Sequence, residues 1–180
     1  MKTPRRRSSA RLLHEMTAAV SDKEKKLELY NHVVEKASLN DIQLTHVDFD
    51  VKQNFYTEPS KRKLGYEVQI EHIHFDAQAG IGAALIDLTV KGTLNRKNGL
   101  RCRAKYIVAY DGLHDCEDEA VEVFLSRVAP FACFPYFRTL FAGLDWSSGL
   151  KLPPLPVFKE APRAPSRDKP KKLASKAKGS

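Results

Sequence analysis

The sequence predicts an α+β fold: a four-stranded antiparallel sheet packed by a long kinked C-terminal helix, with an extra amphipathic helix at the N-terminus. Apolar residues recur at every second position through residues 40–112 and at every third or fourth position on either side of that region. The length of 180 residues suits one domain with appendages. We expect a single domain over residues 12–158, made of a helix at 12–38, the sheet at 40–112, and a helical region with an apolar proline-rich segment at 115–158.

The formal net charge of +8 is concentrated at the two ends of the chain. Five basic residues at 1–11, and eight basic against two acidic residues at 159–180, leave a net charge of −3 for residues 12–158. We therefore expect a disordered basic arm at 1–11 and a disordered basic tail at 159–180. This distribution argues against a DNA-binding surface on the folded domain and leaves open a salt-sensitive attraction of the tails to nucleic acid or an acidic partner.

Residues 22–38 are predicted to form the amphipathic part of the N-terminal helix. Ser21 and Glu24 fit a capping box, in which the serine side chain accepts an amide of the first turn and the glutamate returns to the cap. Either the helix extends backwards and pairs with a second copy of the chain, or it packs on its own sheet, which we favour. Its apolar stripe is Leu27, Tyr30, Val33, Val34 and Ala37, preceded in the same heptad phase by Leu13, Met16 and Val20.

The apolar face of the first expected strand changes side within the strand. Ile42 and Leu44 share one face, and Val47 falls on the other if the alternation is unbroken. Residues 64–79 repeat this change of phase. Each strand therefore contains a β-bulge or has halves that are buried on opposite sides of the sheet.

A hairpin is expected next, because residues 86–94 and 101–110 alternate regularly around the turn sequence Lys97-Asn98-Gly99. The glycine-containing stretch that begins at Ala79 lies between two strands and not before a helix. It therefore does not indicate a dinucleotide-binding loop.

The second helical region is expected to open near Asp115, where acidic residues suit the positive end of a helix dipole. Pro130 and Pro135 break or kink it, which gives one bent helix or two in sequence. Gly143 or Gly149 then ends the helix. Its apolar face is predicted to lie in the core and consists of Phe134, Phe137, Leu140, Phe141 and Leu144.

Neither an enzyme nor a cofactor is indicated. The cysteines at positions 102, 116 and 133 lack metal-site spacing and are expected to be buried thiols. His72, His74 and Asp76 alternate along one strand face, a pattern more typical of a solvated strand edge than of a metal site. With no signal peptide and no apolar run of about 20 residues, we expect a cytoplasmic protein that does not insert into membranes.

Two local patterns carry a resemblance to a known family. The run Phe134-Pro135-Tyr136-Phe137-Arg138 lies in the second helical region, and a Leu/Pro-rich segment reaching Phe158 follows it and cannot be a helix or a central strand. With the four preceding strands, residues 38–158 resemble the SecB-type protein-export chaperones and their SecB-like relatives. The resemblance implies a homotetramer built as a dimer of dimers, grooves that bind unfolded polypeptide without ATP, and a role in export or in support of an antitoxin.

Binding of unfolded chains needs exposed apolar surface and free backbone groups. For several aromatic residues, core packing is the alternative interpretation; for Phe55, Tyr56 and Trp146 the two are evenly balanced. The candidate client-binding residues are Phe55, Tyr56, Trp146, Leu152, Leu155 and Phe158. The sequence therefore predicts an ATP-independent holdase, and its alternative is a nucleic-acid-associated or scaffold protein that binds through its basic tails.

Overall fold

The structure, a computed structural model, describes residues 9–158, with side chains from Ser21 onward. Most of the expected basic arm and the whole basic tail lie outside the described residues, so their disorder stays a prediction. The elements are α1 (Ser9–Lys36), β1 (Ser38–Val51), the 3-10 turns η1 (Gln53–Tyr56) and η2 (Pro59–Lys61), β2 (Arg62–Asp76), β3 (Ile81–Leu94), β4 (Lys97–Asp111) and α2 (Asp118–Ser148).

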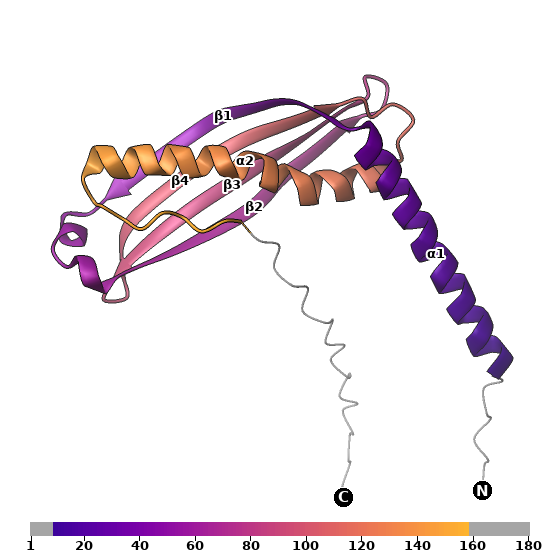
Figure 1. The fold of residues 1–180 in the computed structure, drawn as a ribbon, viewed down its shortest axis with the longest axis horizontal. Coiled ribbons are helices and arrows are strands. Elements are labelled where there is room, and N and C mark those ends of the chain that lie inside the picture. The colour runs from indigo at the N-terminus through magenta and orange to yellow at the C-terminus, as the bar shows by residue number, and fades with distance from the viewer. Residues whose placement is uncertain (1–8, 159–180) are drawn as a thin grey trace, which may run out of the picture.

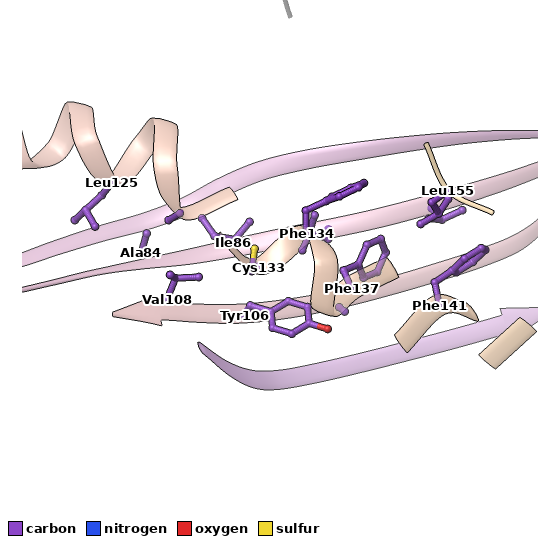
Figure 2. Packing of buried hydrophobic residues seen from close by; sticks show 14 of the residues in the cluster. Ala84, Ile86, Tyr106, Val108, Leu125, Cys133, Phe134, Phe137, Phe141 and Leu155 are labelled. Atoms are coloured by element: carbon purple, nitrogen blue, oxygen red, sulfur yellow. The ribbon is translucent and has the colours of Figure 1, made fainter. Parts of the chain in front are cut away.

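The four strands form one antiparallel sheet in the order β1-β4-β3-β2. The first strand therefore pairs with the last, and the connection that carries η1 and η2 crosses from one edge of the sheet to the other. The helix α2 lies across one face of the sheet (Figure 1). Its side chains and those of the central strands form the core, as Figure 2 shows for Ile86, Tyr106 and Phe137. The α+β architecture expected from the sequence is thus confirmed.

Both expected irregularities are β-bulges. The pairing of β1 with β4 shifts between Leu44 and His46, and the pairing of β2 with β3 shifts between Ile70 and His72. Residues directly opposite each other in a ladder share a face. Because Leu44 and Val47 pair with the buried Tyr106 and Ala104, both halves of β1 face the core side. The bulge interpretation is correct, and the alternative of halves buried on opposite sides is wrong.

The β3–β4 turn lies at Asn95 and Arg96, with φ values of 51° and 65°, so its placement at Lys97-Asn98-Gly99 is wrong. Two successive residues with positive φ are characteristic of the turns whose twist matches a hairpin. Gly99 instead belongs to β4 and packs against the ring of Phe55. Gly99 thus allows the Phe55 ring to lie close to the backbone of β4 and takes no part in the turn.

The second helical region is one helix, which continues through Pro130 and Pro135 and ends at the left-handed Gly149, where φ is 69°. It neither divides into two helices nor stops at Gly143. By length and composition alone α2 could cross a bilayer, but half of its most apolar stretch is buried inside the protein, the usual pattern of a core helix. The predicted core positions Phe134, Phe137 and Phe141 are each at most 2% exposed.

The helix α1 begins at Ser9 and projects away from the sheet (Figure 1). It runs through Ser21, so the capping box predicted there does not start a helix. The C-terminal part of α1 packs against α2, with the Tyr30 and Phe124 rings 6.4 Å apart and Val33 fully buried. The stripe is only partly covered, because Leu27 is 58% exposed.

The sheet face that α2 does not cover carries a network of ion pairs. Arg103 Nε donates to Asp87 at 2.8 Å, and Arg103 Nη2 donates to Glu71 at 3.2 Å. Lys105 donates to the same Glu71 at 2.6 Å. Burial raises the pKa of Asp87. The hydrogen bond and charge of Arg103, with smaller contributions from Glu71 and Lys105, outweigh this effect, so the pKa of Asp87 lies below its ordinary value.

Candidate functional site

An extended segment, Leu150–Phe158, follows α2 and runs back beside it (Figure 1). We call it the proline strap. The groove on one side of the strap has a volume of about 590 Å³ and is shared with Leu64 and Tyr66 of β2. The groove on the other side has a volume of about 540 Å³ and is shared with Arg138 and Phe141 of α2. We call them the β2 groove and the α2 groove.

Both ends of the strap are fixed. The Leu152 amide donates to the two carboxylate oxygens of Asp145 at 3.1 and 3.2 Å. The Phe158 ring lies 4.6 Å from the Phe131 ring and 5.2 Å from the Phe134 ring. Between these contacts Leu155 reaches the core and is 5% exposed (Figure 2).

The local sequence explains the path of the strap. Gly149 and Lys151 have φ values of 69° and 57°, and these left-handed residues reverse the chain at the end of α2. Three of the five residues at 152–156 are prolines, which have no N–H to donate. Among the described residues no backbone hydrogen bond joins the strap to β2. The strap therefore covers this side of the sheet without extending it.

Arg62, the first residue of β2, faces the β2 groove. Its Nη1 donates to the carbonyl oxygen of Leu150 at 2.8 Å, and its guanidinium carbon lies 5.1 Å from the centre of the Phe55 ring. Its Nε is buried and has no hydrogen-bond partner among the described residues. A buried donor without a partner is costly, so this N–H is available to donate a hydrogen bond to a carbonyl oxygen of an occupant.

The structure separates the six candidate client-binding residues into three groups. Phe55 and Leu155 are buried, at 0% and 5% exposure, and are core residues in this chain. Leu152 and Phe158 are half-buried parts of the strap. Tyr56 and Trp146, at 44% and 85% exposure, are open to solvent but line neither groove.

Sequence reasoning missed the polar residues of the site, Arg62 and Asp145. No local signal distinguishes them, because their role depends on where the strap returns relative to β2 and α2. The hydrogen bonds of both residues to the strap go to its backbone atoms. This pair can therefore hold an extended chain with little regard to its side chains.

The cysteines and histidines that the sequence singled out do not form a reactive or metal-binding cluster among the described side chains. Burial raises the pKa of the Cys102 and Cys133 thiols to about 12 and also raises the pKa of Cys116. Within residues 21–158, whose side chains the structure describes, no three side chains are grouped so that they could hold a metal ion. His72 and His74 are exposed on β2.

No protein-family model and no curated protein matches this sequence. Among solved structures, the SecB-like chaperone Rv1957 of Mycobacterium tuberculosis, in complex with a ChAD peptide from the HigA1 antitoxin, matches with a TM-score of 0.61 and 16% identity, over 76% of this chain and 99% of that one. A protein of unknown function from Streptococcus agalactiae has a TM-score of 0.35 and 12% identity, over 66% of this chain and 94% of that one, and no argument rests on it. The sheet, its order of strands and the covering helix therefore give this chain a SecB-like fold.

Proposed function

We propose that this protein is an ATP-independent holdase that binds unfolded or non-native polypeptides in the β2 and α2 grooves. The observation that carries the proposal is the position of the grooves beside β2, an edge strand whose outer backbone groups are not paired by the strap. An extended polypeptide can add to such an edge through backbone hydrogen bonds while its side chains enter neighbouring apolar pockets. That mode of binding accepts many sequences.

The composition of the groove walls supports this proposal. Leu64 and Tyr66 from β2 and Phe141 from α2 supply apolar surface, and Arg62 supplies a donor for a backbone carbonyl. The structural neighbour from Mycobacterium tuberculosis was solved with a peptide from an antitoxin, so at least one protein with this fold holds a polypeptide. We propose the same class of partner here, in protein export or in support of a dedicated client such as an antitoxin.

We further propose that the working form is a cytoplasmic homotetramer, a dimer of dimers. Exposed apolar residues on one edge of the sheet support an assembly: Leu39, Leu44 and Val47 of β1 are 48%, 46% and 40% exposed although they face the core side. Large apolar side chains exposed along one strand are a feature of many subunit contacts.

Two measurements test the proposal together. Light scattering should give a mass near four times 20.3 kDa, and the species should take up a reduced, unfolded protein added to it. The same protein should suppress aggregation of that client near stoichiometric ratios without nucleotide. A protein that leaves aggregation unchanged at a several-fold excess of tetramer is not a holdase.

A second candidate function rests on the charge distribution. Residues 1–8 and 159–180, which lie outside the described residues, carry a net charge of +10, whereas residues 9–158 carry a net charge of −2. This distribution favours a nucleic-acid-associated or scaffold protein that binds through the two end segments. Removing residues 1–8 and 159–180 separates the two functions. Loss of salt-sensitive nucleic-acid binding with client holding intact assigns the nucleic acid to the tails, whereas loss of client holding contradicts the groove proposal.

A further inference from the structure

The proline strap lies inside the candidate site. Residues 152–155 border both the β2 groove and the α2 groove, so the two grooves are the halves of one trough between β2 and α2. The strap occupies the middle of that trough. An extended client that used the full width of the trough would take the position of the strap.

The contacts that hold the strap are of a kind that a client can reproduce. Arg62 binds a carbonyl oxygen and Asp145 binds an amide, and every polypeptide offers both groups. The apolar contribution comes from two aliphatic side chains, Leu150 and Leu155, at 3% and 5% exposure, and from the ring of Phe158 beside Phe131. The strap is therefore bound as a ligand would be bound.

The strap also leaves available contacts unused. Its prolines at 153, 154 and 156 have no N–H groups to offer to β2. The Nε of Arg62 has no partner among the described residues. A client segment without prolines can make hydrogen bonds to the β2 edge that the strap cannot make, and these bonds favour exchange of the strap for the client.

We propose that Leu150–Phe158 is an internal ligand of the trough that a client displaces. The favoured client segment is extended, has free N–H groups facing β2, and has an aliphatic side chain that replaces Leu155. This inference rests on the proposed holdase function and adds to it a self-occupied site with a preference for proline-free apolar segments. Because the site is open only when the strap is out, the apparent dissociation constant is raised by the reciprocal of the open fraction.

Variants that weaken the strap test the proposal through client affinity. Leu155→Ser removes its buried side chain, and Asp145→Ala removes the acceptor for the Leu152 amide while leaving the core intact. Both should tighten binding of a dye-labelled, reduced and alkylated unfolded protein, measured by fluorescence anisotropy, by about tenfold if the strap is closed roughly nine-tenths of the time. Val157→Ser is the matched control, because Val157 belongs to the strap but is 63% exposed, and it should leave the affinity unchanged.

Hydrogen exchange on the unmodified protein gives an independent readout. The Leu152 amide is hydrogen-bonded to Asp145, and it should exchange faster when the unfolded protein is bound. Two results would overturn the internal-ligand proposal and leave the holdase function standing. One is that the wild type binds the unfolded protein and Asp145→Ala binds it no more tightly. The other is that the Leu152 amide is as protected from exchange with the client as without it. If neither the wild type nor either strap variant binds the unfolded protein, the holdase function fails and the inference fails with it.

Discussion

Gly99 of β4 lies so close to the ring of Phe55 that a Cβ atom added to the glycine would overlap the ring carbon Cδ2. The same ring would be 2.7 Å from a Cβ at Gly92 of β3. Phe55 comes from η1, in the connection that crosses from β1 to β2. Two glycines on the central strands thus leave the space in which the Phe55 ring packs, and this packing holds the crossing connection against the sheet.

We expect Gly99→Ala to lower the free energy of unfolding by about 1–3 kcal/mol, the usual cost of forcing extra volume into a packed site. Urea unfolding measures the change. Gly65→Ala in β2 is the control, because nothing lies within 4 Å of the added Cβ there, and it should be neutral or slightly stabilising. Equal effects of the two substitutions would contradict the packing of Phe55 on Gly99.

Asp87→Asn should destabilise the protein by about 1–3 kcal/mol at pH 7, because Arg103 loses a charged partner that is only 7% exposed. The folded-state pKa of Asp87 is lowered from 3.8, so the stability that its charge contributes is fully present above pH 3.8. That contribution is lost as the pH falls through the lower, folded-state pKa. Urea midpoints of wild type and variant should therefore converge in acid. Asp50→Asn, at an exposed position of β1, should show no such convergence.

The three thiols should be unreactive in the folded protein. Burial raises the pKa of Cys102 and Cys133 to about 12, so the reactive thiolate is scarce at pH 8. A chromogenic disulfide reagent should label the native protein slowly and all three cysteines rapidly in urea. Cys116, at 8% exposure, should react first. Rapid labelling of Cys102 in the native state would mean that the core between sheet and α2 is open.

The single tryptophan offers a direct view of the exposed candidate surface. Trp146 is 85% exposed on α2, so acrylamide should quench its fluorescence almost as efficiently as that of free indole. We expect quenching to fall when unfolded client is added, because a large exposed aromatic side chain is typical of a binding surface. Unchanged quenching at saturating client would remove Trp146 from the candidate binding residues.

The bulges in β1 and β2 could be predicted because a change of phase in an alternating pattern is visible in the sequence itself. The pairing of β1 with β4 could not be predicted in the same way. Alternation shows which side of a strand is buried, but it carries no information about which strand lies next to it. The burial of Phe55 could not be predicted either. It depends on Gly92 and Gly99, which have no side chains and are distant from Phe55 in the sequence.

The continuity of α2 shows local and tertiary preferences in conflict. Each internal proline costs a helix about 3 kcal/mol, which is why Pro130 and Pro135 predicted a break as readily as a bend. Burying Phe134, Phe137 and Phe141 contributes about 1.5–3 kcal/mol each. The two sums are comparable, so only the packed structure decides between one helix and two.

The prolines of the strap have a consequence for how the protein behaves at high concentration. A sheet with long edge strands is a template on which identical chains can stack into fibres. At β2 that template is shielded by a neighbour that cannot itself propagate hydrogen bonding, since Pro153, Pro154 and Pro156 have no donors. Replacing these prolines would therefore be expected to turn a protective cover into a fifth strand, with a new edge exposed to the next molecule.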